Sequence, residues 1–153
     1  MAGGRPSGPK TRCSGQWTEA RFNSFIISAL RGASRKWAPM QQAIKNASTG
    51  RGYFDCAECG ENCPTSIVID GKRFKNKIAD HIDPIVDPAK GHEGWDTFVE
   101  RMFVELDGWQ ILCKKCHDEK TGEERAIAVE RRRREKANGE ELKLTESETK
   151  KKN

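Results

Sequence analysis

Two pairs of cysteines have the spacing of metal ligands. Cys56 and Cys59 form one Cys-x-x-Cys pair, and Cys113 and Cys116 form a second. Each pair places two thiolates on one turn, and two such turns supply the four sulfur ligands of a tetrahedral zinc site. Cys63 offers a further thiol, either as a substitute ligand or as a structural residue. We therefore predict a structural zinc site with four cysteine ligands.

A second set of residues, one carboxylate and two imidazoles, could bind a cation and carry out a separate task. Asp80 and His81 are consecutive in "ADHIDPI", at the end of a predicted strand, and His117 directly follows Cys116 in "CKKCHDEKT". Neighbouring strand residues point to opposite faces, so the carboxylate and the imidazole can have separate tasks. One residue along a helix is a turn of about 100°, so His117 can leave the zinc face and enter a neighbouring cleft.

Together these motifs resemble the HNH endonucleases, also called ββα-metal or His-Me finger nucleases. The family pattern is a Cys-x-x-Cys pair, an Asp-His or His-His pair with a nearby proline, and a strand that enters "LCxxCHxxKT". This chain has "CAEC", "DHIDP" and "ILCKKCHDEKT", so the resemblance covers about residues 53–122. The preceding helical segment (17–47) and "WDTFVERMFVE" are also similar to parts of small phage-type members.

The resemblance implies a role for each matched residue. His81 is implied as the general base, and Asp80 and His117 as ligands of a catalytic divalent cation. Mg²⁺ is the expected ion, and Mn²⁺ or Ni²⁺ are alternatives because one ligand is an imidazole. The four cysteines match the structural zinc. The implied reaction is hydrolysis of a DNA phosphodiester bond, which leaves 5′-phosphate and 3′-hydroxyl ends.

One position departs from the family pattern. The family usually has asparagine five residues before the third cysteine, and this chain has Gly108. That asparagine normally helps to orient the loop and the base histidine. Gln110, Asp107 or a backbone contact could replace it. Provided that Gly108 needs no positive φ, an asparagine there is expected to leave activity equal or raised.

The partner implied by the resemblance is double-stranded DNA. A net charge of +5 and a pI of about 8.9 allow a polyanionic partner without requiring one. A run of four arginines could equally be a solvated helix face. The candidate DNA-binding residues are Arg31, Arg35, Lys36, Lys120, Arg131, Arg132, Arg133 and Arg134.

Hydrophobic periodicity predicts the elements that must position these residues. Apolar residues between Trp17 and Leu30, and between Trp37 and Ala47, recur at spacings of three and four, which predicts two helices in a hairpin. Thr18 is a plausible cap for the first of them. The remaining predicted elements are a strand ending in an Asp70-Gly71 turn, a helix at 96–106, a strand at 109–113 and a helix from about residue 116 to about 137.

The predicted fold class is α+β, with a ββα-metal core, a pair of cysteine knuckles and a basic C-terminal helix. A length of 153 residues fits one domain. We expect a disordered basic arm (1–16), N-terminal helices (17–50), a nuclease core (51–137) and a flexible tail (138–153). No apolar run approaches the ~18–20 residues of a membrane span, and no secretory signal is recognised. We therefore expect a cytoplasmic protein, in the host cell if phage-encoded.

The preferred interpretation is a metal-dependent HNH DNA endonuclease. The alternative is a non-catalytic zinc-knuckle protein that binds DNA or assists phage DNA packaging. Gly108 favours the alternative, whereas the joint presence of Asp80, His81 and His117 favours the enzyme. The sequence leaves open whether one or both strands are cut, which sequence is preferred, and whether the protein is a monomer or a homodimer. It also leaves open a homing, restriction or packaging role.

Overall fold

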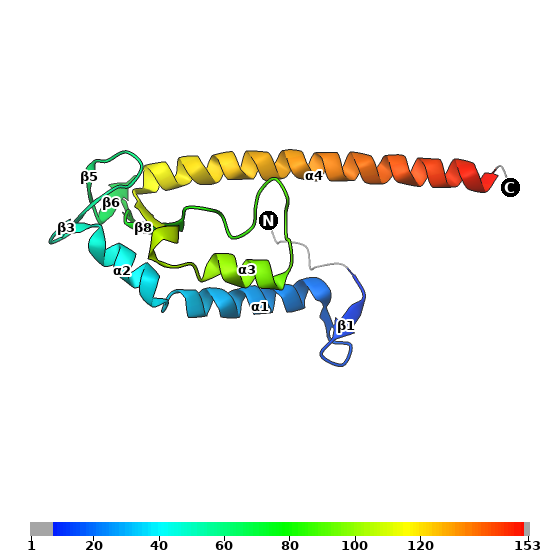
Figure 1. Cartoon of the computed structure of the whole chain (residues 1–153), viewed down its shortest axis with the longest axis horizontal. Coiled ribbons are helices and arrows are strands. Elements are labelled where there is room, and N and C mark those ends of the chain that lie inside the picture. The colour runs from blue at the N-terminus through cyan, green and yellow to red at the C-terminus, as the bar shows by residue number, and fades with distance from the viewer. Residues whose placement is uncertain (1–7, 152–153) are drawn as a thin grey trace.

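The computed structural model describes residues 8–151, and the side chains of residues 8–141. Within this part the chain is mixed α/β, with four α-helices and several small sheets. Figure 1 shows the long helix α4 (Lys114–Lys151) along one side of the molecule. Most of the strands are gathered at the end where α4 begins, whereas β1 lies far from that end, beside the start of α1 (Glu19–Ser34). None of the helices in the described part is long and apolar enough to cross a bilayer.

The first described residues form a small hairpin, which differs from the disordered arm predicted for residues 1–16. β1 (Lys10–Arg12) pairs antiparallel with β2 (Trp17–Thr18). Arg12 packs on the ring of Phe22 and forms an ion pair with Glu19 at 2.7 Å, so α1 holds the hairpin in place. Residues 1–7 of the predicted arm lie outside the described residues.

Two helices follow, as predicted, but they do not form a hairpin. Thr18 caps α1 (Glu19–Ser34) by accepting a hydrogen bond from the backbone N–H of Arg21 at 3.2 Å. α2 (Ala38–Asn46) continues away from α1 instead of folding back on it (Figure 1). The linker is only three residues long, and α2 is held by other parts of the chain. The indole of Trp37 donates to the carbonyl of Val104 at 2.7 Å.

The cysteine-bearing turn grows out of a three-stranded antiparallel sheet. Its order is β3 (Ser48–Gly50), β4 (Tyr53–Asp55) and β5 (Asn62–Pro64). The sheet's one fully buried aromatic side chain, Phe54, faces Cys63 across β4 and β5. Both belong to a core that includes all the buried cysteines, so the hydrophobic core and the thiol cluster are one unit.

A separate two-stranded ribbon follows. β6 (Ser66–Ile69) pairs with β7 (Lys72–Lys75) in antiparallel register. Asp70 and Gly71 both have positive φ, 49° and 75°, as a two-residue hairpin turn of the primed type requires. The turn predicted from the Asp-Gly pair is therefore confirmed.

The predicted site residues lie on a second antiparallel pair and on the helix that follows it. β8 (Ile78–His81) pairs with β9 (Trp109–Leu112), with Asp80 opposite Gln110 and His81 opposite Trp109. α4 (Lys114–Lys151) begins directly after β9 and packs against both strands. β8 and β9 thus pair although α3 and η1 lie between them in the chain, and α4 follows β9.

The helix predicted at 96–106 is shorter than expected. α3 (Trp95–Met102) is followed by a 3₁₀ turn, η1 (Leu106–Gly108). Of the predicted apolar stripe, Phe98 and Met102 are buried, whereas Val99 and Leu106 are exposed. The N-cap is Gly94, not Asp96. Asp96 lies one residue inside the first turn, where its charge favours the helix N-terminus.

α4 continues past the predicted end near residue 137 and includes most of the predicted tail. Its outer part is highly polar, and ion pairs at i,i+4 spacing support it, including Arg131–Glu135 and Lys136–Glu140. Figure 1 shows this part projecting beyond the other elements. A polar helix of this kind has no apolar stripe by which sequence periodicity could detect it.

Candidate metal centre and surrounding site

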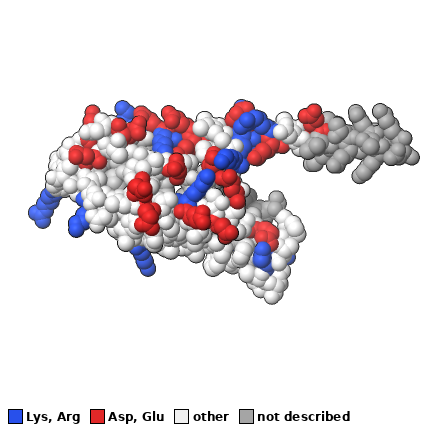
Figure 2. Space-filling view, in the orientation of Figure 1, with Lys and Arg blue, Asp and Glu red and all other residues white. Residues whose placement is uncertain are grey.

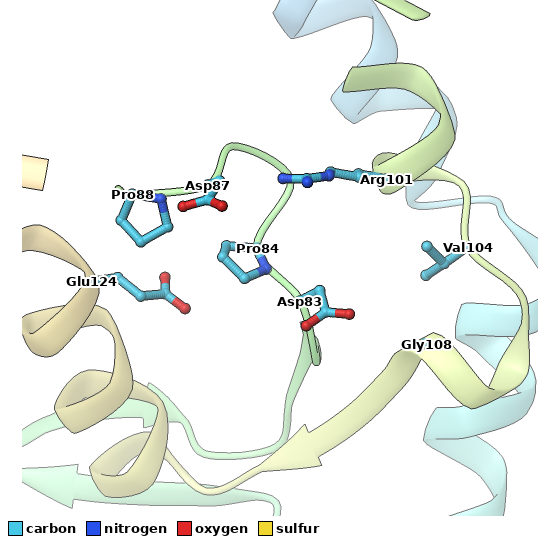
Figure 3. A pocket seen from close by; sticks show the side chains of 8 residues that line it. All are labelled: Asp83, Pro84, Asp87, Pro88, Arg101, Val104, Gly108 and Glu124. Atoms are coloured by element: carbon cyan, nitrogen blue, oxygen red, sulfur yellow. The ribbon is translucent and has the colours of Figure 1, made fainter. Parts of the chain in front are cut away.

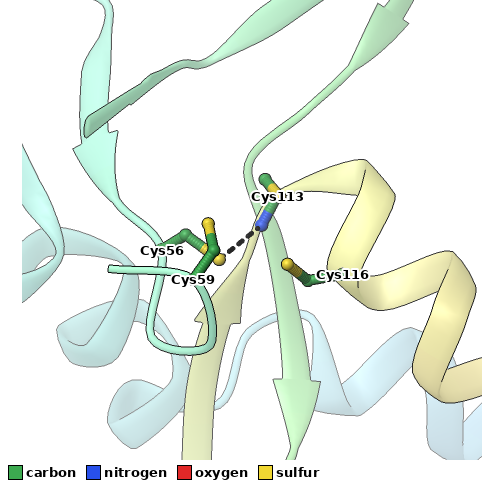
Figure 4. Close-up of side chains that lie close together, drawn as sticks. All are labelled: Cys56, Cys59, Cys113 and Cys116. Carbon is green, nitrogen blue, oxygen red and sulfur yellow. Dashed lines mark hydrogen bonds between the residues drawn. The ribbon is translucent and has the colours of Figure 1, made fainter. Parts of the chain in front are cut away.

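The four cysteines of the two Cys-x-x-Cys pairs meet at one place, as predicted. Their Sγ atoms all lie within 4.8 Å of one another. Cys56 and Cys59 come from the turn after β4, Cys113 from the end of β9, and Cys116 from the first turn of α4 (Figure 4). Three of the four are buried, and Cys59 is exposed at the edge of the cluster.

Backbone geometry explains why the turn after β4 can carry two converging thiols. Gly60 has φ 70°, which reverses the chain directly after Cys59, and its N–H donates to the carbonyl of Cys56 at 2.9 Å. The N–H of Cys113 donates to Sγ of Cys56 at 3.3 Å, so the two knuckles are joined by a hydrogen bond (Figure 4).

The thiols influence one another strongly. Burial raises the pKa of Cys56, but hydrogen bonds from the N–H groups of Cys113, Cys59 and Glu58 outweigh burial and bring the pKa down to about 7. Burial raises the pKa of Cys116, and its thiol neighbours raise it further. One thiolate is therefore favoured in the cluster without a cation, and four are not, because adjacent negative charges repel.

The donor set fits a tetrahedral, thiolate-binding ion such as zinc. Zn–S bonds of about 2.3 Å give sulfur–sulfur separations of roughly 3.8 Å in a tetrahedron, within the 4.8 Å spread of the cluster. Cys63 also lies within this distance of Cys59 and Glu61. Burial raises the pKa of Cys63 to about 11, which favours the thiol form and a structural role.

Asp80 lies on the face of β8 that α4 covers. Its Oδ2 accepts hydrogen bonds from the amide of Gln110 at 3.0 Å and from the ammonium of Lys120 at 2.6 Å. No hydrogen bond to Oδ1 is found among the residues that the structure describes. One carboxylate oxygen is therefore held by the protein, and the other makes no hydrogen bond with the described residues.

His81 is held by different neighbours. Its ring lies against the indole of Trp109, with centroids 4.0 Å apart, and its Nε2 is 3.0 Å from the carbonyl oxygen of Met102. A carbonyl only accepts, so Nε2 carries the proton and Nδ1 of the neutral ring has the lone pair. Asp80 and His81 thus have separate surroundings, in agreement with the alternation expected along a strand.

His117 lies on α4 one residue after the cysteine cluster and is only partly exposed. Its Nδ1 is 3.5 Å from Oδ1 of Asp118. A hydrogen bond from Lys114 lowers the pKa of Asp118, and the contact with His117 lowers it further. Among the described residues, Asp80, His81 and His117 do not form a group of three ligand atoms within 4.8 Å. Asp80 and His81 lie on β8 and His117 lies in the first turn of α4, and the structure does not gather the three at a common point.

Gly108 is explained by packing and not by a strained backbone. Its φ is not in the left-handed region, but a Cβ there would lie 2.6 Å from Cγ2 and 2.7 Å from Cβ of Val104. The carbonyl of Gly108 accepts a hydrogen bond from the N–H of Ile82 at 3.0 Å. This backbone hydrogen bond fixes Ile82, the residue after His81. A backbone contact of this kind is one of the features that could replace the missing asparagine.

The predicted DNA-binding residues fall into two groups. Lys120 and Arg131 are largely covered and face the protein. Lys120 contacts Asp80 and Glu124, and the guanidinium of Arg131 lies over Gly91 and contacts Glu135. The exposed residues are Arg31, Arg35, Lys36, Arg132, Arg133 and Arg134. Figure 2 shows that acidic side chains are prominent on the face in view and that basic ones are scattered.

One hollow beside the site, of about 410 Å³, lies between α3, α4 and the loop after β8. Figure 3 shows carboxylates entering it from the loop and from α4, with Arg101 opposite. Asp83, Asp87 and Glu124 make it predominantly acidic. A phosphate would be repelled there, so this hollow is a poor candidate for the DNA path.

Several residues that organise the site could not be recognised in the sequence. Asn76 is the one buried polar residue recorded in the described part. Its side chain donates to the carbonyl of Pro64 at 2.7 Å and accepts from the N–H of Lys114 at 2.8 Å. It therefore joins β5 to the first turn of α4, beside the cysteine cluster. No local signal distinguishes this asparagine from a loop residue.

No protein-family model, curated protein or solved structure matches the chain.

Proposed function

We propose that the chain is a metal-dependent DNA endonuclease of the HNH type, with a structural zinc ion in the four-cysteine cluster. The observation that carries this proposal is the placement of Asp80 and His81 on adjacent residues of β8, beside α4. Asp80 has one carboxylate oxygen that makes no hydrogen bond with the described residues, and His81 has its Nε2 held by the carbonyl of Met102. Phosphodiester hydrolysis needs a carboxylate oxygen to bind the cation and an imidazole held in position to accept a proton from water, and Asp80 and His81 would supply these two groups.

His81 is the general base of this proposal. With its proton on Nε2, it presents Nδ1 to accept a proton from water as that water attacks phosphorus. The bond between phosphorus and the 3′-oxygen then breaks, which leaves 5′-phosphate and 3′-hydroxyl ends. The stacking on Trp109 and the contact with Met102 keep the ring from rotating while it accepts the proton.

Asp80 and His117 are the residues that would hold a catalytic divalent cation. Carboxylate oxygen and imidazole nitrogen suit Mg²⁺, Mn²⁺ or Ni²⁺. Such a cation would supply charge stabilisation for the phosphate and the leaving oxygen. Gln110 and Lys120 orient the Asp80 carboxylate through Oδ2. Since four thiolates must stay reduced, we place the protein in a cytoplasm, that of the host cell if it is phage-encoded.

Two observations favour the alternative, a non-catalytic zinc-knuckle protein that binds DNA or assists phage DNA packaging. The ammonium of Lys120 already neutralises Asp80, and His117 is not gathered with Asp80 and His81. In such a protein the Lys120–Asp80 pair would be a purely structural link between β8 and α4.

A plasmid assay separates the two functions. Supercoiled plasmid is incubated with the zinc-loaded chain, with and without added Mg²⁺, Mn²⁺ or Ni²⁺, and the ends are mapped. The endonuclease predicts metal-dependent nicks or breaks with 5′-phosphate ends that DNA ligase can reseal. Retention of plasmid on the protein with no cleavage under any of these ions would support the DNA-binding alternative instead.

A further inference from the structure

The β6–β7 ribbon lacks the buried face that normally stabilises a small sheet. None of its eight strand residues is buried. Val68 is 64% exposed, Ile69 43% and Phe74 38%, and the main packing partner of each strand is the other strand. An isolated two-stranded hairpin is marginal in water. Exposed apolar surface of this kind often marks an interaction site, so we expect the ribbon to bind a partner.

The charge of the ribbon indicates the class of that partner. Lys72, Arg73 and Lys75 are all exposed. In the described part of the chain none of the three forms an ion pair, unlike Lys120 and Arg131. Asp70, in the turn, is the ribbon's single acidic residue. Apolar side chains interleaved with unpaired cations are complementary to a polyanion that also has apolar surface. The grooves of nucleic acids combine these properties, because phosphates flank the edges of the bases.

The register assigns these side chains to two faces. Val68 is opposite Arg73, and Ser66 is opposite Lys75, so these four residues share one face. The other face has Ile67 opposite Phe74 and Ile69 opposite Lys72. Each face therefore presents apolar and cationic groups together. The ribbon can contact both walls of a groove at once.

The base of the ribbon is fixed. Asn76, directly after β7, is buried and binds both Pro64 and Lys114, and its N–H donates to the carbonyl of Thr65 at 2.9 Å. β8, with Asp80 and His81, starts two residues later. A rigid base of this kind keeps the ribbon at a set position relative to the proposed catalytic residues.

We propose that the β6–β7 ribbon inserts into the major groove of double-stranded DNA and sets the position of the duplex relative to β8. The proposal rests on the proposed function, in that duplex DNA is the partner. The major groove of B-DNA is about 12 Å wide and accepts a two-stranded ribbon as it stands, whereas the minor groove, about 6 Å wide, accepts one only when the duplex is deformed. The deep, narrow major groove of duplex RNA excludes it. Arg73 and Lys75 bind phosphates, and Val68 lies against base edges.

The test is a binding measurement that contains no cleavage step. Fluorescence anisotropy follows the binding of the zinc-loaded full-length chain to a labelled DNA duplex, without Mg²⁺, at several salt concentrations. The ribbon variant is Arg73→Ala/Lys75→Ala. The matched control, Lys10→Ala/Lys90→Ala, removes the same charge from exposed positions elsewhere. Zinc content and far-UV circular dichroism show that each variant is folded.

We expect the ribbon variant to bind DNA at least about tenfold more weakly. The slope of the logarithm of the binding constant against the logarithm of the salt concentration should fall in magnitude by about 1.8, which is about 0.9 for each of the two lost phosphate contacts. The control should stay within about twofold of wild type. Unlabelled duplex RNA should compete at least about tenfold less well than DNA. Equal losses in both variants, wild-type binding by the ribbon variant, or equal competition by RNA would each overturn the proposal.

A second variant tests whether the ribbon mediates self-association instead of DNA binding. Val68→Asp changes its most exposed apolar side chain, and we expect weaker DNA binding with the same sedimentation coefficient as wild type. Conversion of a dimer to a monomer with unchanged DNA affinity would overturn the proposal in favour of a second copy. Ribbon-dependent binding by a protein that fails to cleave plasmid would overturn only the endonuclease. Failure of the wild type to bind duplex DNA would overturn both.

Discussion

The ammonium of Lys120 lies 2.6 Å from Oδ2 of Asp80 and also donates to the backbone carbonyl of His81. One side chain of α4 is thus bound to two consecutive residues of β8. Both side chains of the ion pair are mostly covered, which limits screening by solvent. Lys120 therefore serves as a link between helix and strand and is not free to bind phosphate.

This link makes a stability prediction. Lys120→Met removes the ammonium and keeps much of the apolar stem. It leaves the Asp80 carboxylate and the His81 carbonyl without that donor. We expect the free energy of unfolding to fall by about 1–3 kcal/mol, the usual worth of hydrogen bonds to charged groups. Urea denaturation of the zinc-loaded protein measures it, with the exposed Lys115→Met as the matched control. Equal midpoints for the two variants would contradict the assigned role.

Gly108 gives a prediction that differs from the one made from sequence. The backbone would accept another residue, but Val104 occupies the space of a Cβ. Gly108→Asn is therefore expected to destabilise the protein by about 1–3 kcal/mol through overpacking. Adding Val104→Ala should recover part of that loss. If the single variant is as stable as wild type in urea, Val104 moves aside and the original expectation of unimpaired activity returns.

Arg131 and Arg132 should respond differently to truncation although they are neighbours in the arginine run. Arg131 lies over Gly91 with its side chain 20% exposed, whereas Arg132 is exposed to solvent. Arg131→Ala should destabilise the contact between α4 and the 87–91 loop by about 1 kcal/mol through lost packing. Hydrogen exchange in that loop should speed up in this variant and not in Arg132→Ala. Identical exchange in both would contradict the packing role.

Mutation can separate the four-cysteine site from the proposed catalytic cation site. Cys56→Ser and Cys113→Ser should lose zinc and unfold the core, because structural zinc contributes on the order of 10–16 kcal/mol of apparent binding energy. His117→Ala should keep zinc and fold, and lose cleavage that high Mg²⁺ or Mn²⁺ partly restores. Cys13→Ser is the exposed control, and Cys63→Ser should retain zinc. Elemental analysis and circular dichroism measure these outcomes. Zinc loss in His117→Ala would mean that the histidine serves the cysteine site.

Local spacing was enough to predict the features that depend on neighbouring residues. The Cys-x-x-Cys pairs, the Asp70-Gly71 turn and the strand before Cys113 were all found where the sequence placed them. The convergence of the two cysteine pairs, 57 residues apart, was also predicted, because a tetrahedral ion needs four ligands.

Features set by distant packing were missed or misjudged. The inward direction of Lys120 depends on how α4 packs against β8. The contact of Arg131 with Gly91 depends on how α4 packs against the 87–91 loop. The expected helical hairpin was wrong because Trp37 binds Val104, far along the chain, and holds α2 away from α1. The predicted tail is helical in residues 138–151. The ion pair of Lys136 with Glu140 supports the part of this helix whose side chains the structure describes, and such pairs leave no apolar pattern in the sequence.

The most direct test of the proposed function is the cleavage rate of His81→Ala. Its matched control is His92→Asn, which changes the histidine stacked on Trp95, outside the proposed site. Both variants are assayed on supercoiled plasmid with Mg²⁺, after their zinc content and DNA affinity are shown to equal those of wild type. We expect a loss of at least ~10²-fold for His81→Ala and a near-wild-type rate for His92→Asn. Cleavage by His81→Ala at the wild-type rate would contradict the proposed function.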